Sequence, residues 1–455
     1  MKIFRAVILI FLCCVLNFQL CFAEPTLELK AKSALLIEET TGKVLYGKDE
    51  NLKVYPASIT KVLTCLVALE YLDENEFVTV GDEINSVPYD SSKAGNRVGE
   101  SLRVDNMMRL ILIPSGNETS CVAAREVARR VTGNPAISYA EAERVFADLM
   151  NKKAKELGAT SSNFVNPHGY YDINHYTTAS DMAKICRAAM GVPLIRQIVS
   201  EKRFKGSGSP VADEFTQEYN FVTHNELLVT TSEYYYPYAT GIKTGTHDQA
   251  GDCLAASAER DGKKLIALAF DSPDGGRWTD TITLFDYGFD NFNFETLHTK
   301  DSVIEEIKVK RPPLGVVDTA QILADSEYTD FLTESEFANI RPHVVYDKKY
   351  VEDGLLLTPI EAGTKVGTIT YSISDNVLYS GDLISAASVQ KRTFSTDTKY
   401  YLDAVRTKSF TRAAVPYWIA FVSLLFIASQ IAIAQRKRRR NKSFTMRNRR
   451  KKRRK

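Results

Sequence analysis

The chain has 455 residues, of which 44% are hydrophobic and 25% are charged. This composition provides apolar material for two or three cores, so it excludes wholesale disorder and a polytopic membrane protein. The net charge of +2 is unevenly distributed, because 14 basic residues and no acidic residue follow Gln435. Residues 24–435 are correspondingly acidic, which makes the body of the chain a poor candidate for binding nucleic acid.

The first 23 residues have the pattern of a secretory signal peptide. Two basic residues precede an uncharged apolar run, and Cys21 and Ala23 supply small residues just before a cleavage site at Glu24. The alternative is a retained anchoring helix, but the apolar run is short for a membrane span. We therefore expect export and a mature chain that begins at Glu24.

Residues 24–296 are expected to form the first folded domain. Strand-like segments at 33–37 and 43–46 flank a Thr-Thr-Gly turn, which is typical of a hairpin. Apolar periodicity then predicts helices over residues 58–71, 101–113, 120–130, 140–157 and 179–190. Further strands at 253–258 and 264–270 and a helix at 279–287 complete the domain. Strands first and last with helices between them predict an α+β domain, in which both ends contribute to one antiparallel sheet.

Residues 297–390 differ from the first domain in their pattern of apolar and polar residues. Short alternating segments at 304–310, 340–346 and 365–371 are separated by Pro-Pro, Asp-Gly and Ala-Gly. Alternation with a period of two and turn residues between the segments predict a small, mainly β domain. The polar residues 391–412 are expected to form a stalk.

Residues 413–434 are uncharged and rich in Ile, Leu, Phe, Val and Ala. As a helix, these residues would extend about 33 Å, which is enough to cross a bilayer. The basic residues 435–455 follow directly, so we expect a single-pass membrane protein with a cytoplasmic tail and an extracellular body. A nucleic-acid-binding arm is the alternative for the tail, and its position after a spanning segment disfavours it.

Four cysteines lie in the body, at Cys65, Cys121, Cys186 and Cys253. Each lies in an apolar stretch, and none has the CxxC or Cys/His spacing of a zinc site. We expect buried free thiols and no metal or other cofactor.

Three short motifs suggest chemistry, and the first is Ser58-Ile59-Thr60-Lys61. Residues three apart share one face of a helix, so the Lys61 amine would lie beside the Ser58 hydroxyl and accept its proton. Burial lowers the pKa of a lysine amine, which makes it usable as a general base.

The second motif is Ser115-Gly116-Asn117, which offers a second hydroxyl for proton transfer and an amide to hold a peptide group. The third is Lys243-Thr244-Gly245, whose cation and hydroxyl suit an anionic substrate terminus. Gly245 would let a ligand lie against the strand.

Sequences that fit the first two motifs also occur elsewhere in the chain, so the context of each copy decides which one is assigned to the site. The segment 388–391 also fits SxxK, and the segments 161–163 and 374–376 also fit SxN. The quartet at Ser58 opens an apolar helix and is followed in order by SxN and KTG within one domain, whereas Ser388 follows the KTG and leads into the stalk.

In this arrangement the motifs resemble those of the serine-type D-alanyl-D-alanine carboxypeptidases, the low-molecular-mass penicillin-binding proteins of bacteria. The likeness extends over about residues 27–388 and rests on Pro-Ala-Ser-Ile-Thr-Lys at 56–61, Pro-Ser-Gly-Asn at 114–117, Asn-Pro-His-Gly at 166–169, His-Tyr-Thr-Thr-Ala at 175–179 and Gly-Ile-Lys-Thr-Gly at 241–245. It implies a penicillin-recognising transpeptidase or β-lactamase-like fold, a peptidoglycan stem peptide as substrate, and inhibition by β-lactam antibiotics.

The resemblance also implies roles for individual residues. Ser58 would be the nucleophile, Lys61 its general base, and Ser115 the group that passes the proton to the leaving D-alanine. The remaining residues would bind substrate: Asn117 its backbone, Lys243, Thr244 and Thr246 its carboxylate, and the backbone N–H groups of Ser58 and Thr246 the oxyanion.

The histidines receive no catalytic task. His168 is expected to be structural, since Lys61 already fills the base role. Where relatives often have arginine this chain has His224, and neither His224 nor His247 is assigned a function.

Two alternatives stay open at this point. A β-lactamase shares the motifs, although no Glu-x-x-Leu-Asn sequence lies between SxN and KTG to supply a deacylating base. A non-catalytic wall-binding scaffold would share the fold, but the retention of Ser58, Lys61, Ser115 and Lys243 disfavours it.

Overall fold

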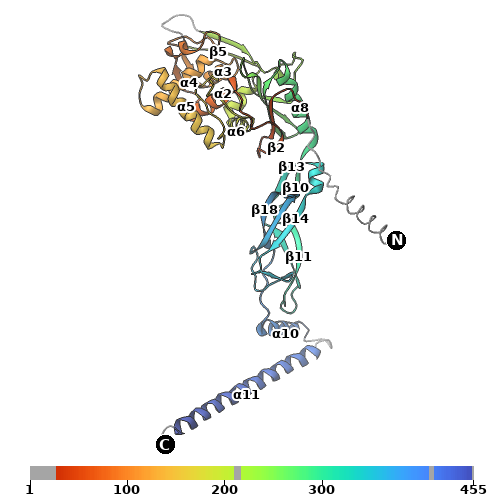
Figure 1. Cartoon of the computed structure of the whole chain (residues 1–455). Helices are drawn as coiled ribbons and strands as arrows, with labels where there is room; N and C mark the ends of the chain where they lie inside the picture. The colour runs from red at the N-terminus through yellow and green to blue at the C-terminus, as the bar shows by residue number, and fades with distance from the viewer. Residues whose placement is uncertain (1–26, 210–216, 409–414, 453–455) are drawn as a thin grey trace, which may run out of the picture. The chain divides into compact units, whose positions relative to one another are not determined.

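The computed structural model describes residues 27–209, 217–408 and 415–452 (Figure 1). The predicted signal peptide, residues 1–23, lies outside the described residues. The chain divides into two compact units between Asn293 and Phe294, three residues before the predicted domain boundary. Each unit is described by itself.

The first unit is built around a five-stranded antiparallel sheet with the order β2-β1-β9-β8-β7. Its strands are β1 (Ser33–Glu38), β2 (Val44–Lys48), β7 (Ala239–His247), β8 (Gly251–Arg260) and β9 (Lys263–Ser272). The N-terminal hairpin therefore pairs with strands from the far end of the domain, which confirms the predicted α+β arrangement.

Both faces of this sheet are covered, as the burial of all six residues of β1 indicates. Successive side chains of a strand point to opposite faces. Leu35 and Ile37 belong to the main core cluster, whereas Leu36 lies against α8 (Gly276–Asn291), close to Gly288. Figure 1 shows α8 and the helices α2 to α6 on different sides of the sheet.

Helices form most of the rest of the unit. Their bounds are α2 (Thr60–Ala68), α3 (Val104–Leu112), α4 (Asn117–Thr132), α5 (Tyr139–Glu156), α6 (Ala179–Met190) and α7 (Pro193–Ser200), with 3-10 turns η1 (Ala57–Ile59), η2 (Asp82–Ser86) and η3 (Glu226–Leu228). All nine residues of α2 are buried, so this helix is enclosed by the others. The Thr178 side chain caps α6 by accepting a hydrogen bond from the Asp181 backbone.

The helix predicted over residues 101–113 was too long. Residues Ser101–Arg103 form the strand β4, which pairs with β3 (Phe77–Thr79), and α3 begins only at Val104. Pairing with a distant strand overrides the local helical pattern here. A further hairpin joins β5 (Arg203–Ser207) to β6 (Glu218–Val222).

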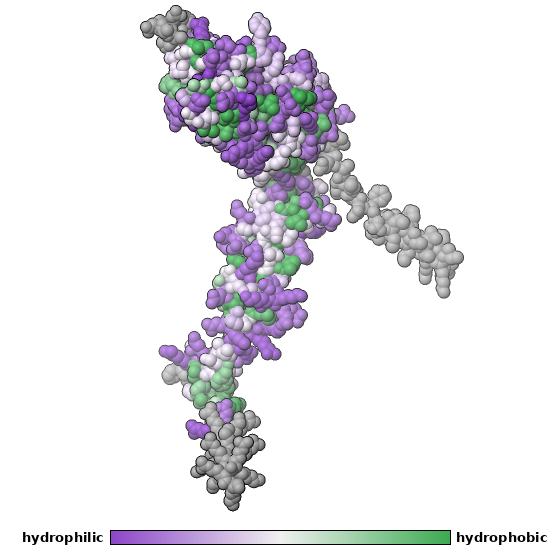
Figure 2. Space-filling view, turned by 60° about the vertical axis from the view of Figure 1, so that its left-hand side comes forward, coloured by the Kyte–Doolittle hydropathy of each residue, from purple (hydrophilic) through white to green (hydrophobic). Residues whose placement is uncertain are grey.

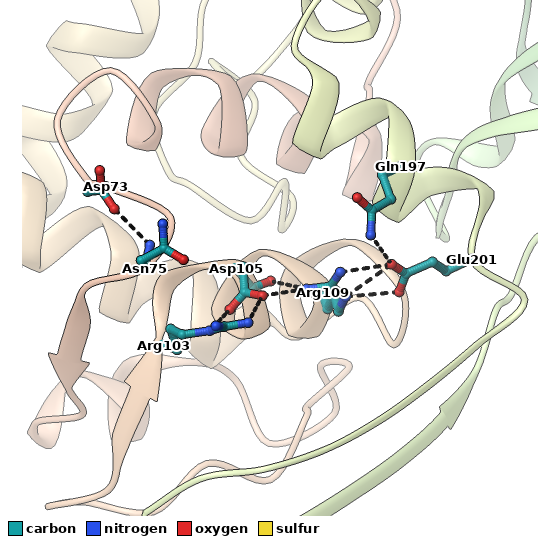
Figure 3. A network of polar contacts seen from close by, with 7 residues as sticks. All are labelled: Asp73, Asn75, Arg103, Asp105, Arg109, Gln197 and Glu201. Carbon is teal, nitrogen blue, oxygen red and sulfur yellow. Dashed lines mark hydrogen bonds and ion pairs between the residues drawn. The ribbon is translucent and has the colours of Figure 1, made fainter.

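A polar network links α3 to α7 (Figure 3). The Arg109 Nε and Nη2 atoms each donate to the Glu201 carboxylate at 2.9 Å, and its Nη1 donates to Asp105 at 2.9 Å. The Arg109 and Glu201 side chains are only 12% and 22% exposed. Helix α3 leads directly into the Ser115 motif, and α7 packs on β7, which carries Lys243. The network therefore connects the supports of two predicted site motifs.

The second unit is mainly β, as predicted. Its seven-stranded sheet has the order β14-β17-β18-β12-β11-β16-β15, and β10 pairs with β13. The elements are β10 (Phe292–His298), β11 (Val303–Val309), β12 (Thr319–Ala324), β13 (Tyr328–Thr333), α9 (Glu334–Asn339), β14 (Arg341–Tyr346), β15 (Val351–Glu352), β16 (Leu355–Leu356), β17 (Lys365–Ile373) and β18 (Asn376–Ser385). A separate core, which includes Ile322, Leu332 and Val366, fills this unit.

Two helices follow the β strands. The predicted stalk contains α10 (Phe394–Lys408), and α11 (Val415–Lys452) includes most of the predicted spanning segment. Residues Val415–Lys437 include an 18-residue window with a mean hydropathy of 2.0 and are long and apolar enough to cross a membrane. Figure 2 shows apolar side chains on the surface of this segment, whereas hydrophilic side chains are prominent on the first unit.

Candidate active site

The Ser58 hydroxyl and the Lys61 amine lie in contact at the start of the buried helix. Ser58 is in the 3-10 turn η1, and Lys61 is in the first turn of α2. Their Oγ and Nζ atoms are 2.8 Å apart. Ala57, just before Ser58, has a φ of +46°, which is uncommon for a residue with a side chain. The serine is thus held at a sharply turned entry to the helix.

Lys61 is fully buried, and none of its hydrogen-bond partners is a carboxylate. Its Nζ donates to Asn117 Oδ1 at 2.6 Å and to the His168 carbonyl oxygen at 2.8 Å. Burial, and next the charge of Lys243, hold the pKa of Lys61 well below its ordinary value.

This environment suits a neutral amine. The Asn117 and His168 oxygens can only accept, so they use the two N–H groups of an uncharged lysine. The lone pair of the nitrogen then remains for the Ser58 hydroxyl proton. These contacts are compatible with Lys61 acting as a base toward Ser58, and that role stays a prediction.

Ser115 and Asn117 lie on the short connection between α3 and α4. Asn117 is the first residue of α4, and its backbone N–H donates to the Ser92 carbonyl at 2.9 Å. Ser115 is buried and has a φ of +64°. Among the described residues its hydroxyl makes no hydrogen bond, so its role in proton transfer stays a prediction.

The KTG motif lies on β7, the edge strand of the sheet nearest η1. A Cβ on Gly245 would lie 2.9 Å from the Pro56 carbonyl oxygen and 3.1 Å from the Ser58 backbone nitrogen. Only glycine allows the strand to come this close to the nucleophile. The motif and the serine are therefore brought together by main-chain contact.

Lys243 and Thr244 are both buried in this strand. The Lys243 ammonium donates to the Thr244 carbonyl oxygen at 3.0 Å. Burial and the charge of Arg277 lower the pKa of Lys243 to about 7. A buried cation without a carboxylate partner is well suited to bind an anionic group.

Two further residues belong to this region, although the sequence analysis did not identify them. Arg277 Nη1 donates to Thr246 Oγ1 at 2.7 Å and to Asp252 Oδ1 at 3.1 Å. Arg277 lies in the first turn of α8 and Asp252 in β8, so no local motif connects either of them to the KTG. Only the pairing of β7 with β8 and the packing of α8 place them there.

A cleft of about 390 Å³ opens above the nucleophile. Of the predicted site residues, Ser58, Asn117 and Thr246 line it. The other lining residues come from two loops and from the end of β7 with the turn after it: Asp90, Ser91, Ser92, Gly169, Tyr170, Tyr171, His247, Asp248 and Gln249. The Tyr170 hydroxyl donates to Asp90 at 3.2 Å, which links two of these loops.

The histidines near the cleft have structural contacts. His168 Nδ1 accepts from the Tyr170 backbone at 3.1 Å, and burial and the Lys61 charge keep the pKa of His168 far below its ordinary value. His175 is hydrogen-bonded to Thr60 Oγ1 and to the Val165 backbone, and burial lowers its pKa to about 3. Gly169, with a φ of +81°, follows His168 and packs on the Ala57 carbonyl.

The four body cysteines are free and buried, which confirms the prediction. Within residues 27–209, 217–408 and 415–452, no three His, Cys, Asp or Glu side chains are grouped so that they could hold a metal ion.

Comparison with known proteins agrees with this geometry. A family model described as D-alanyl-D-alanine carboxypeptidase matches residues 21–274, and a model of the penicillin-binding protein 5 C-terminal domain matches residues 292–391. D-alanyl-D-alanine carboxypeptidase DacF of Bacillus subtilis is 28% identical over 377 residues, which are 81% of this chain and 88% of that protein.

Solved structures are similar in fold. Penicillin binding protein 5 from Haemophilus influenzae has a TM-score of 0.60 at 24% identity and covers 81% of this chain and 100% of its own. The Streptomyces K15 DD-transpeptidase has a TM-score of 0.53 at 25% identity and covers 59% of this chain and 99% of its own.

These similarities confirm the predicted fold class and support a serine-type carboxypeptidase over a β-lactamase. The family model alone spans more than half of the 455 residues. The chain belongs to the D-alanyl-D-alanine carboxypeptidase family.

Proposed function

We propose that this enzyme removes the terminal D-alanine from peptidoglycan stem pentapeptides and that Ser58 forms the acyl-enzyme. The observation that carries the proposal is the 2.8 Å contact between Ser58 Oγ and Lys61 Nζ. Since Lys61 is buried without a carboxylate partner, its amine can be neutral at physiological pH and accept the hydroxyl proton.

Acylation begins when Ser58 Oγ attacks the carbonyl carbon of the D-alanyl-D-alanine bond while its proton passes to Lys61. The backbone N–H groups of Ser58 and Thr246 stabilise the resulting oxyanion. The C–N bond then breaks, and the leaving nitrogen takes the proton from Lys61 through Ser115. Asn117 holds the substrate backbone beside Lys61.

The free carboxylate of the substrate binds at the KTG strand. Lys243, Thr244 and Thr246 supply a cation and two hydroxyls, and Arg277 adds a second cation beside Thr246. Gly245 leaves room for the peptide to lie along β7. Recognition of a terminal carboxylate accounts for cleavage of one residue from the end of a peptide.

Water completes the reaction by hydrolysing the ester and regenerating Ser58. A β-lactam acylates the same hydroxyl, but its ring-opened product stays attached and blocks the cleft. We therefore expect penicillins to be inhibitors that are hydrolysed slowly.

The test is to measure D-alanine release from a stem pentapeptide and labelling by a fluorescent penicillin. Ser58→Ala should lose both activities and remain folded, because no other hydroxyl can form the acyl-enzyme. Ser388→Ala is the matched control, since Ser388 belongs to the second SxxK sequence, and it should retain both. Labelling that persists in Ser58→Ala would overturn the assignment.

We also propose that α11 tethers the enzyme to the cell membrane, with the catalytic unit outside and the basic tail in the cytoplasm. The apolar stretch Val415–Lys437 and the basic residues from Arg436 onward support this topology. Carbonate should leave the full-length chain in the membrane, whereas a chain that ends at Lys408 should be soluble. Protease cleavage of a C-terminal tag on intact protoplasts would contradict the topology.

A further inference from the structure

Three polar side chains meet at the end of β7, beside the cleft. Thr246 is the cross-strand partner of Asp252, so their side chains lie next to each other on one edge of the sheet. Arg277 reaches the same point from the first turn of α8. Thr246 lines the cleft, and it links the cleft to Asp252 and Arg277, which are not among the lining residues.

Asp252 is the acceptor that these residues share. Its Oδ1 accepts from Arg277 Nη1 at 3.1 Å and from Thr246 Oγ1 at 3.0 Å, and Arg277 Nη1 also donates to Thr246 Oγ1 at 2.7 Å. The Arg277 and Asp252 side chains are 17% and 15% exposed, so water screens this ion pair only partly. The three contacts form a closed triangle.

The rest of the Arg277 guanidinium is held in place, but not all of its N–H groups have hydrogen-bond partners. Its plane lies against the Trp278 ring, with Cζ 4.7 Å from the ring centroid. Among the described residues, all hydrogen bonds of Arg277 come from Nη1, and its buried Nε has no partner. Asp252 therefore fixes one corner of the guanidinium, and the Nη2 group, which makes no hydrogen bond to a described residue, remains for an anionic ligand.

We propose that Asp252 is a positioning residue for substrate binding: it orients Arg277 and Thr246 toward the terminal carboxylate of the peptide. This inference rests on the proposed function, because it assumes that a carboxylate binds beside Thr246. Without Asp252, the Arg277 side chain loses its carboxylate partner, and the Thr246 hydroxyl loses one of the two acceptor oxygens within its reach.

A competing interpretation makes the opposite prediction. If the Asp252 carboxylate merely occupied the site in place of the substrate, its removal would free Arg277 and strengthen binding. The Nη2 group of Arg277, which makes no hydrogen bond to a described residue, favours positioning over competition.

The test compares Asp252→Ala with Asp252→Asn in the full-length enzyme, with kcat and KM measured for D-alanine release from a stem pentapeptide. Asp252→Ala should raise KM about tenfold and change kcat little, since a charged hydrogen bond is lost from the binding site. Asp252→Asn keeps an acceptor oxygen toward Arg277 and should recover most of that loss.

Two controls separate positioning from general damage. Asp290→Ala removes a carboxylate from an ion pair with Arg260 away from the cleft, and its KM should stay at the wild-type value. A pentapeptide with a C-terminal carboxamide lacks the charge that Arg277 would bind, so Asp252→Ala should not weaken its turnover further. Asp252→Thr, which retains a strand-forming residue, replaces Asp252→Ala if the latter does not fold.

The outcomes are distinct. A KM for Asp252→Ala that is unchanged or lower than that of the wild type would overturn the proposal, as would an equal loss with the carboxamide substrate. Failure of the wild-type enzyme to release D-alanine would instead reject the proposed function.

Discussion

The close approach of Gly245 to the nucleophile makes a sharp prediction for Gly245→Ala. The new Cβ would lie 2.9 Å from the Pro56 carbonyl oxygen, 3.1 Å from Ala57 Cβ and 3.1 Å from the Ser58 nitrogen. Ordinary van der Waals contacts begin near 3.5 Å, so the strand and the turn must separate by several tenths of an ångström. Two of the three opposing atoms are backbone, and no side-chain rotation relieves the clash.

This displacement affects the atoms that perform acylation. Ser58 and Thr246 supply the proposed oxyanion donors, and Gly245 directly precedes Thr246 and packs against the Ser58 backbone nitrogen. Loss of one oxyanion donor costs about 100- to 1000-fold in rate, so a partial displacement should cost about 10- to 100-fold in acylation. Overpacking at the sheet edge should lower the free energy of unfolding by about 1 to 2 kcal/mol.

The assay is the second-order rate of labelling by a fluorescent penicillin, measured beside thermal unfolding. Gly47→Ala is the matched control, because Gly47 is on the opposite edge strand and its Cβ would meet only the flexible Glu50 side chain. This variant should acylate at the wild-type rate. If Gly245→Ala also does so while unfolding normally, the proposed dependence of acylation on this contact is wrong.

Two other predictions concern charge. The pH profile of kcat/KM should be bell-shaped. Activity should rise as Lys61 loses its proton, at a pKa that burial and the Lys243 charge lower. Activity should fall as Lys243 loses its proton at about pH 7. Arg277→Leu should move the falling limb of the profile to higher pH, because the Arg277 charge lowers the pKa of Lys243. A falling limb at the wild-type pH would contradict this assignment. Glu201→Gln should lower the free energy of unfolding, measured by chemical denaturation, by about 1 to 2 kcal/mol, because it breaks the partly buried ion pair with Arg109. A decrease below about 0.3 kcal/mol would show that the network does not stabilise the fold.

The contact between Ser58 and Lys61 could be predicted because it is local. Ser58 and Lys61 are three residues apart at the start of an apolar helix, and helical geometry alone brings their side chains together. The same reasoning anticipates a low pKa for Lys61, since a helix that is mostly apolar is expected to be buried. For Ser58 and Lys61, the spacing in the sequence is therefore enough to predict the contact in the structure.

The partners that complete the site could not be predicted in this way. The His168 carbonyl accepts from Lys61 across 107 positions of sequence, and no side-chain pattern marks a carbonyl group. Arg277 and Asp252 are 25 positions apart and meet through sheet pairing and helix packing. Residues 101–103 could not be assigned from local sequence for the same reason, because they have a helical pattern but form a strand through pairing with β3. Contacts that depend on tertiary pairing leave little trace in local sequence.

The two buried lysines show how binding and chemistry depend on each other. In the proposed mechanism, Lys243 needs its charge to attract the substrate carboxylate, and Lys61 needs to lose its charge to accept the Ser58 proton. The Lys243 cation favours the neutral form of Lys61 by lowering its pKa, after the larger effect of burial. One charge thus helps to hold the substrate and to prepare the base. Lys243→Met should therefore shift the acid limb of the acylation profile upward as well as raise KM, which a residue that only bound substrate would not do.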